Sequence, residues 1–484
     1  MLSASKYRGV VVSPSPMPKA AAQPSPAAAT ATASYRMLWR WHFYAGLFVM
    51  PFLIVLSITG TIYCFQPQIE PLLYPRLLRV APAGSKLPAQ DLLDRAWAQA
   101  PEGSAATTYT LDPDPRASAE FVFRLPSGKS QSLYLDPYTG EYLGSLSVED
   151  RLMKQVRLLH RALLLGKTGE LLMELAACWA LVMIATGLAM WWPRLRAKGA
   201  GAFLAGNAAG GRGWWKEIHL VTGAWLALGA VAFILSGLPW SASWGKQFKA
   251  LATAAQLGNP PGAWGDAGVR STPGAPRMDS LPLAEVPWAV GLSKVPRGTA
   301  PAAGTATISL DRAVGIVAAN GVPSGCQLVL PGSPTGVFTA SCFPADPRME
   351  RTLHIDQYSG KVLKDIRYGD YGAVAQAISY GTSLHMGRYF GLANQIACTA
   401  ISLGLMALAV TGLIMWLKRR PARALAAPSF PRNLPPMRAW VAGLGLLGLV
   451  FPLMGATLAM VWLLDRRFAP AVAARAPSPE DAAA

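Results

Sequence analysis

The chain has 484 residues, of which 52% are hydrophobic and only 14% are charged. An ordinary soluble domain carries more charge, so much of this protein's surface must lie in lipid. The net charge of +18 would suggest a nucleic-acid partner in a soluble protein, but here the cations cluster beside apolar segments. We therefore interpret them as topology signals, and we expect membrane lipid and no nucleic acid as a partner. Five cysteines are too few for a disulfide scaffold.

A polar tail and five apolar segments divide the chain. Residues 1–34 are rich in Ala, Pro, Ser and Thr and predict a disordered cytoplasmic tail. Five segments reach the ~20 apolar residues that cross a hydrocarbon core of ~30 Å. They lie at about 38–64, 171–192, 219–240, 393–417 and 439–464. We assign them to transmembrane units 35–64, 151–192, 218–240, 371–417 and 439–464, of which the second and fourth begin with an amphipathic stretch.

The connections between these units differ in charge. The tail and the linkers 193–217 and 418–438 hold many Lys and Arg and almost no acids, and all three fall on one side if the segments alternate. The positive-inside rule places that side in the cytoplasm. Residues 65–150 and 241–370 and the C-terminal tail 465–484 then face outward.

Each long outward segment predicts a small α+β lobe, because turns separate short alternating runs. In the first lobe, 87–100 predicts a helix, and 107–111, 119–125 and 130–135 predict strands. In the second, 309–320 predicts a helix, and 326–330, 336–342, 351–355 and 361–367 predict strands. Cys326 and Cys342 could face one another across the 328–339 hairpin, so we expect a disulfide there. Cys64, Cys178 and Cys398 lie in or beside apolar helices and should be free.

The chain contains a parallel internal repeat. Leu-Tyr-Leu-Asp136-Pro-Tyr-Thr-Gly140 in the first lobe matches Leu-His-Ile-Asp356-Gln-Tyr-Ser-Gly360 in the second. Each match is followed by a His, a spanning run and the motif Thr-Gly-Leu-x-Met-Trp. The distance from this His to the Trp is 31 residues in both repeats, from His160 to Trp191 and from His385 to Trp416. The unit of helix, lobe and helix therefore occurs twice in the same orientation. Parallel repeats are related by an axis along the membrane normal, and shared sites tend to lie between the halves.

Four of the five histidines occupy matched positions of this repeat, His42 with His219 and His160 with His385. A neutral imidazole is a common iron ligand, and an ionisable residue at membrane depth indicates function. The first two begin outward-going helices, whereas the other two precede inward-going helices. We therefore expect two bis-His metal or haem sites, one near each face. An unbroken helix from His160 to Trp191 would be ~46 Å long, so the outer histidines must lie above the core or on helices that fold back.

Other polar features predict structure rather than chemistry. His354 lies on a predicted strand and corresponds to Tyr134 of the first lobe, so we expect it to be dispensable. Glu170 and Glu174 predict a solvated or interfacial helix face. Residues 199–213 predict a flexible linker.

The chain resembles the PepSY-associated transmembrane family, which includes iron-regulated inner-membrane proteins and ferrisiderophore reductases. The resemblance covers about residues 36–417 and rests on Trp-His42-x-Tyr-x-Gly46, the two Asp-x-x-[Thr/Ser]-Gly turns, Leu-His160, Ile-His219-Leu-Val-Thr-Gly223 and Leu-His385-Met-Gly-Arg-Tyr-Phe-Gly391. It implies PepSY lobes in the periplasm of a bacterial inner-membrane protein. Its reductase members imply b-type haems on membrane-helix histidines, here His42, His219, His160 and His385, and electron flow to ferric siderophores.

We thus expect an all-α membrane bundle of five transmembrane helices in a parallel repeat, with two small α+β lobes and two haems b. No Gly-x-Gly-x-x-Gly opens a helix, so quinol or a separate cytoplasmic reductase must supply the electrons. Ferric-chelate reduction is one reading of this chemistry. A transporter of siderophore-related or haem-related compounds, or a non-enzymatic PepSY binding or regulatory protein, are the alternatives. Haem absorbance of the purified protein would separate electron transfer from both.

Overall fold

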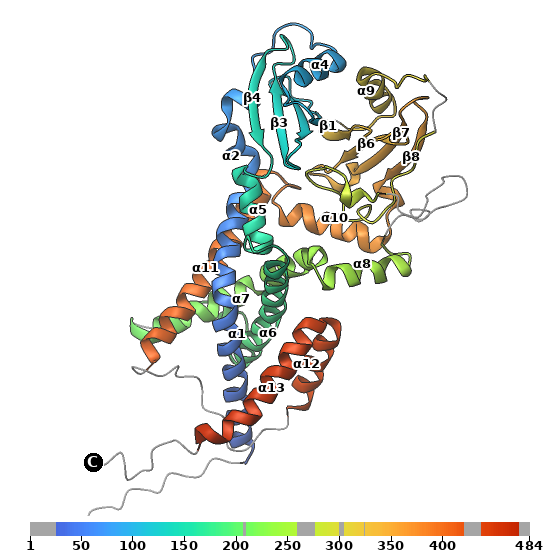
Figure 1. The fold of residues 1–484 in the computed structure, drawn as a ribbon. Coiled ribbons are helices and arrows are strands. Elements are labelled where there is room, and N and C mark those ends of the chain that lie inside the picture. The colour runs from blue at the N-terminus through green and yellow to red at the C-terminus, as the bar shows by residue number, and fades with distance from the viewer. Residues whose placement is uncertain are drawn as a thin grey trace, which may run out of the picture.

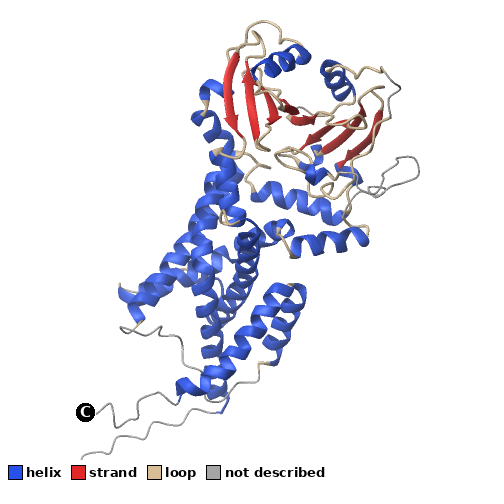
Figure 2. Cartoon of the chain, viewed as in Figure 1, coloured by secondary structure: helices blue, strands red, loops and turns tan. Residues whose placement is uncertain are grey.

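The computed structural model describes residues 26–206, 210–258, 276–299, 304–323, 325–420 and 437–473. A stalk of long helices carries a β-sheet at one end (Figures 1 and 2). We call the end next to the sheet the lobe side and the opposite end the far side. Most of the expected disordered tail, 1–34, lies outside the described residues. Helix α1 begins at Pro26, however, so residues 26–34 are helical, contrary to the sequence prediction.

Four helices among the described residues are long and apolar enough to cross a membrane, at Thr32–Cys64, Gly166–Phe203, Gly213–Trp240 and Leu392–Arg419. They correspond to α1 (Pro26–Cys64), α6 (Gly166–Lys198), α7 (Gly211–Gly237) and α11 (Leu392–Arg419). α1 packs against both α6 and α11, and α7 packs against the same two helices. Each repeat thus contributes two helices to a four-helix bundle.

The first of the two expected linkers is shorter than expected, and both lie partly outside the described residues. α6 continues to Lys198, and a 3-10 helix follows at Gly199–Phe203 before α7 starts at Gly211. Most of the linker expected at 193–217 is therefore helical. Residues 207–209 of that linker and 421–436 of the linker at 418–438 lie outside the described residues, as do residues 474–484 of the C-terminal tail.

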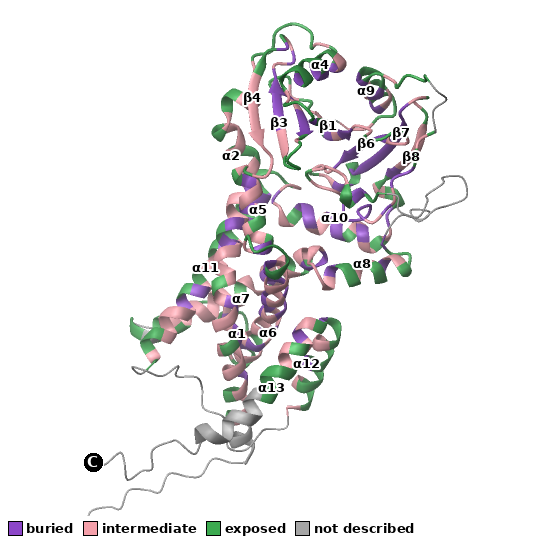
Figure 3. Ribbon diagram, in the orientation of Figure 1, coloured by how far each residue is buried: buried purple, intermediate pink, exposed green. Residues whose placement is uncertain are grey.

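The fifth apolar segment, residues 439–464, is not one spanning helix, and this part of the sequence prediction was wrong. It is divided into α12 (Arg438–Val450) and α13 (Pro452–Ala473), which pack against each other. Pro452 lacks the N–H needed to continue α12, and its ring clashes with the preceding turn. A Cβ at Gly455 would lie 2.5 Å from the carbonyl oxygen of Gly448, so the helices touch backbone to backbone. They form a hairpin whose described residues are mostly exposed or half-buried (Figure 3).

Short helices on the lobe side precede α6 and α11. α5 (Leu152–Ala162) ends in a tight turn where Leu163 and Leu164 have positive φ, and α6 starts at Gly166. α10 (Ala373–His385) ends at a turn containing Gly387 and Gly391, which also have positive φ. In each repeat the chain therefore folds back before the spanning helix, which is one of the two arrangements that the length argument allowed. Beyond α1, α2 (Gln66–Leu73) and α3 (Pro75–Leu78) lead to the sheet.

The two lobes share one antiparallel sheet, whereas the sequence predicted two separate lobes. The first contributes β1 (Ala105–Leu111), β2 (Ala119–Arg124), β3 (Ser130–Leu135) and β4 (Tyr142–Ser147). The second contributes β5 (Cys326–Val329), β6 (Val337–Cys342), β7 (Arg351–Asp356) and β8 (Val362–Arg367). The order is β4-β3-β2-β1-β5-β6-β7-β8, so pairing of β1 with β5 joins the lobes. β4 was missed by the sequence analysis.

Two helices, α4 (Ala89–Gln99) and α9 (Leu310–Ala319), cover one face of the sheet (Figure 1). Their apolar sides complete the hydrophobic core of both lobes. Asp311 of α9 accepts a hydrogen bond from the backbone N–H of Ala89 (2.6 Å), and Gln90 of α4 accepts one from the N–H of Leu310 (2.9 Å). Each helix thus caps the other's N-terminus, which holds the lobes together a second time.

The other face of the sheet is connected to the bundle by α10 and by α8 (Trp244–Ala254). Glu174 of α6, expected on a solvated or interfacial face, is only 4% exposed. Its carboxylate accepts hydrogen bonds from the backbone N–H groups of Ser243 (2.8 Å) and Trp244 (3.1 Å). Glu174 therefore satisfies donors at the start of α8, which gives its burial a structural cause.

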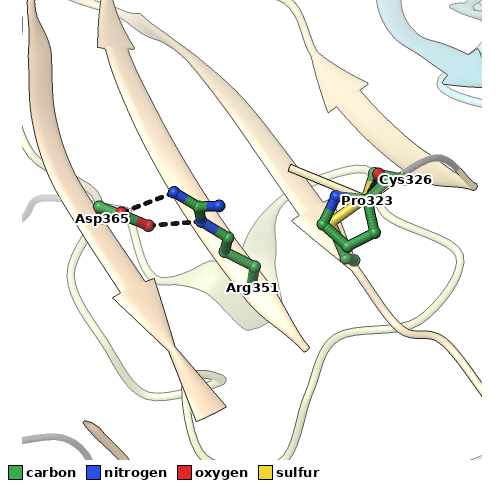
Figure 4. Close-up of a disulfide and its surroundings, with 5 residues drawn as sticks. Pro323, Cys326, Arg351 and Asp365 are labelled. Atoms are coloured by element: carbon green, nitrogen blue, oxygen red, sulfur yellow. Dashed lines mark hydrogen bonds and ion pairs between the residues drawn. A yellow bond between two sulfur atoms is a disulfide. The ribbon is translucent and has the colours of Figure 1, made fainter. Parts of the chain in front are cut away.

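Cys326 and Cys342 form a disulfide between β5 and β6 (Figure 4). On the adjacent strand pair, Arg351 donates two hydrogen bonds of 2.8 Å to Asp365. Cys64, Cys178 and Cys398 are free and buried.

Candidate functional site

The structure brings His42 and His219 together inside the helix bundle. His42 lies on α1 of the first repeat and His219 on α7 of the second. Their ring centres are 6.3 Å apart, and the ring planes are nearly perpendicular, at 85°. Both residues are half-buried. One histidine from each repeat thus lies beside its counterpart between the halves.

His160 and His385 form a second pair with almost the same geometry. They lie on the short helices α5 and α10, with ring centres 6.3 Å apart and planes at 86°. Burial lowers the pKa of His160 to about 3, with a smaller contribution from His385, and burial lowers the pKa of His385 to about 4. Both imidazoles are therefore neutral at physiological pH, which is the form that binds a metal.

Each of the four imidazoles contacts a Ser/Thr-Gly pair on another helix. The pairs are Thr59-Gly60 of α1 for His160, Thr186-Gly187 of α6 for His42, Ser236-Gly237 of α7 for His385 and Thr411-Gly412 of α11 for His219. The hydroxyl oxygens lie 2.9, 3.2, 2.9 and 3.0 Å from Nδ1, in that order. Each glycine faces Cε1 of the same ring. A Cβ built on the glycine would lie 3.3 Å from that atom at Gly60, 3.1 Å at Gly187, and 3.6 Å at both Gly237 and Gly412.

The hydroxyl groups determine which ring nitrogen carries the proton. Each donates its own hydrogen to a backbone carbonyl of its helix, as Thr59 does to Val55 at 2.6 Å. It can then only accept at the imidazole, so Nδ1 must carry the N–H. Nδ1 of His42 also lies 2.9 Å from the carbonyl oxygen of Met183, which cannot donate. The neutral rings therefore have their lone pair on Nε2, as in metal-binding histidines whose other nitrogen is held by a partner.

The spacing of the rings fits a metal held between two imidazoles. An imidazole nitrogen binds a transition metal at about 2.0 Å and lies about 1.1 Å from the ring centre, so opposed ligands put the centres roughly 6.2 Å apart. Both pairs have 6.3 Å. The described residues contain no group of three or more His, Cys, Asp or Glu side chains that could hold a metal ion. Two imidazoles at this spacing, with no third such side chain beside them among the described residues, fit a metal whose remaining ligands come from a macrocycle, as in haem.

The two pairs lie at different depths of the bundle. On α1, 18 residues separate His42 from Gly60, which contacts the second pair, and on α7 the same number separates His219 from Gly237. At a rise of about 1.5 Å per residue, the two sites are about 27 Å apart along the helices. The first lies toward the far side and the second at the lobe side.

A charged cluster that the sequence analysis did not single out lies beside the second pair. Glu285 of the second lobe accepts hydrogen bonds from Tyr63 of α1 (2.8 Å), Arg157 of α5 (3.4 Å) and Arg388 of the α10–α11 turn (2.9 Å). One carboxylate therefore binds the lobe to α1, to α5 and to the α10–α11 turn, beside this site. Only tertiary contacts bring these residues together, so no local pattern could have indicated them.

His354 lies apart from both pairs, on β7. It is fully buried, and its Nδ1 lies 2.9 Å from the hydroxyl of Thr339 on β6. Burial lowers its pKa to about 3. Its position within the sheet agrees with a structural role.

A family model described as the PepSY-associated TM region matches residues 39–419. The matched segment includes both histidine pairs, their four Ser/Thr-Gly pairs and the whole sheet, and it ends with α11. Among curated proteins, none matches the chain.

Proposed function

The chain belongs to the PepSY-associated TM family, and on this premise we propose that it is an electron-transfer protein of a bacterial inner membrane that holds two b-type haems. His42 and His219 would bind the haem toward the far side, and His160 and His385 the haem at the lobe side. The observation that supports this most is the equal spacing of the two pairs, 6.3 Å, with Nε2 as the available nitrogen in all four rings.

Haem b supplies an iron that accepts and releases one electron at a time. The chain's own residues supply the ligand nitrogens, keep Nδ1 protonated through hydroxyl acceptors and surround the rings with helices that limit access of water. Two sites about 27 Å apart along the bundle divide the path across the membrane into two shorter distances.

We propose in addition that the lobe side faces the periplasm and that electrons leave there to a ferric siderophore. The Lys- and Arg-rich linkers support this orientation, since both follow the far-side end of a spanning helix, α6 or α11. Reduction of a ferric chelate weakens its hard oxygen coordination, so that iron can leave. The electron donor would be quinol or a separate cytoplasmic reductase.

Single His→Ala substitutions test this proposal. Each of the four changes would remove one of the two histidines that would hold a haem, so each should remove or shift about half of the haem signal in reduced-minus-oxidised spectra. His354→Ala is the matched control and should leave the spectrum unchanged, because that residue lies within the sheet. Absence of haem from wild-type protein made in haem-replete cells, or an intact spectrum in all four variants, would defeat the proposal and favour a transporter or a PepSY binding protein.

A further inference from the structure

We infer that the four Ser/Thr-Gly pairs are positioning residues that orient each imidazole and present the two ligands of a site with crossed ring planes. The inference rests on the proposed haem function and extends it to residues that touch no iron. Its basis is the repetition of one contact pattern at four places, Thr59-Gly60, Thr186-Gly187, Ser236-Gly237 and Thr411-Gly412.

Two contacts fix the plane of each ring. A histidine side chain turns about two bonds from its own helix, and here a hydrogen bond at Nδ1 and a packing contact at Cε1 both come from another helix. The interplanar angles of 85° and 86° then agree although the sites share none of these residues. The same device in each repeat therefore produces the same crossed arrangement at both depths.

The type of acceptor has a chemical consequence. A hydroxyl is neutral, so it draws the Nδ1 proton less strongly than a carboxylate would, and the ligand keeps the character of imidazole rather than imidazolate. Crossed imidazole planes give ferric low-spin iron a strongly anisotropic electron paramagnetic resonance signal, whereas parallel planes give a rhombic one. The resonance signal and the midpoint potential of a bound haem would therefore report on these pairs.

Variants of one residue on α1 test the hydroxyl. Thr59→Val removes it at nearly constant volume, Thr59→Ser restores it, and Thr61→Val is the control, because the Thr61 hydroxyl has no hydrogen-bond partner among the described residues. We expect Thr59→Val to weaken haem retention at the lobe-side site roughly 10- to 100-fold and to change its anisotropic signal. A tenfold change in the ratio of ferric to ferrous affinity would move its midpoint potential by about 59 mV. Thr59→Ser and Thr61→Val should resemble the wild type.

The outcomes separate this inference from the proposed function. If the wild type carries haem and Thr59→Val matches Thr61→Val in haem content, resonance signal and potential, the inference is wrong and the haem function stands. If the wild type carries no haem, both fail. Should Thr59→Val not yield folded protein, Ser236→Ala decides, because it removes only the oxygen that bonds His385.

Glycine variants provide an independent measurement at the other site. A Cβ at Gly187 would lie 3.1 Å from Cε1 of His42, which is tighter than ordinary contact, whereas one at Gly223 of α7, which belongs to none of the four pairs, would lie 3.8 Å from the side chain of Leu408, which is ordinary contact. We expect Gly187→Ala to turn the His42 ring and alter the resonance signal of the far-side haem, and Gly223→Ala to leave that signal unchanged. Equal spectra for the two variants would contradict the role of the glycines.

Discussion

Glu350 is a carboxyl group placed in an apolar interior, between the start of β7 and α10. It is 3% exposed, and the hydroxyl of Ser379 on α10 donates a hydrogen bond of 3.1 Å to it. Burial raises the pKa of Glu350 to about 7, and the neighbouring hydroxyl groups of Ser379 and Tyr371 oppose that rise. The folded protein therefore keeps this proton at pH values where the unfolded chain, with its ordinary carboxyl pKa, has lost it.

The raised pKa makes the stability of the lobes depend on pH. Because the folded state binds more protons than the unfolded state between the two pKa values, stability falls as pH rises through this window toward about 7. Glu350→Gln imitates the neutral acid, so we expect it to raise the free energy of unfolding by up to about 3 kcal/mol at pH 8 and by little at pH 4.5. Thermal unfolding at both pH values measures this, with the exposed Glu102→Gln as control. An equal gain at both values would mean that ionisation is not the cause.

Single residues differed in how far the sequence alone revealed them. The histidines stood out because matched positions of the repeat hold four of five. The Thr-Gly pairs of α6 and α11 were visible as part of the repeat, but their contact with imidazoles depends on how α1 and α7 pack beside them. Glu174 gave no signal of its role, since the N–H groups that it binds are about 70 residues away in the chain.

At the level of elements, the disulfide is the feature with the clearest effect on stability. Cys326 and Cys342 are 16 residues apart, and in the chain-entropy model a bond that closes a loop of about that length contributes about 3 kcal/mol. We expect Cys326→Ala/Cys342→Ala to lower the free energy of unfolding of the lobes by about this amount. Denaturant unfolding of the purified protein measures it, and addition of reductant should abolish the difference. Reaction of both thiols with a labelling reagent in the native, unreduced protein would contradict the disulfide.

Elements with a strong local pattern were predicted well, and those without one were not. The strands at residues 130–135 and 351–356 alternate apolar side chains over a buried face, which is a period-two signal. β4 has no fully buried residue, so its alternation is weak. The segment 439–464 was misread because mean hydropathy counts residues without regard to backbone geometry. The break at Pro452 becomes decisive only when Gly448 and Gly455 let the two halves pack together.

The joint between the lobes shows what lies beyond local sequence. Pairing of β1 with β5 connects residues about 220 positions apart, and the match of Asp136 with Asp356 shows only that the two lobes are alike. Their exchange of helix caps depends on Asp311 and Gln90, which occupy ordinary first-turn positions. The repeat predicted two similar units. It did not predict that their strands would pair edge to edge into one sheet next to one helix bundle. The lobe-side histidine pair therefore lies beneath a single continuous sheet.

The C-terminal hairpin determines on which side of the membrane the C-terminus lies. α12 has 13 residues and rises about 20 Å, and the apolar part of α13, Pro452–Leu463, rises about 18 Å, so neither crosses a core of ~30 Å. α13 ends near the far side, where α1 begins (Figure 1). The sequence Asp465-Arg466-Arg467 then joins the other cation-rich segments on the far side, in agreement with the positive-inside rule, whereas a fifth span would put these arginines outside.

Reporter fusions test this arrangement. We expect a fluorescent protein fused after residue 484 to be active in the cytoplasm, on the same side as one fused to the N-terminus, because the hairpin returns the chain to the side it left. Alkaline phosphatase inserted near residues 110 and 340 should be active in the periplasm and serves as the internal reference. Phosphatase activity at the C-terminus would show that residues 439–464 cross the membrane after all, and cytoplasmic signal at 110 or 340 would reverse the whole bundle.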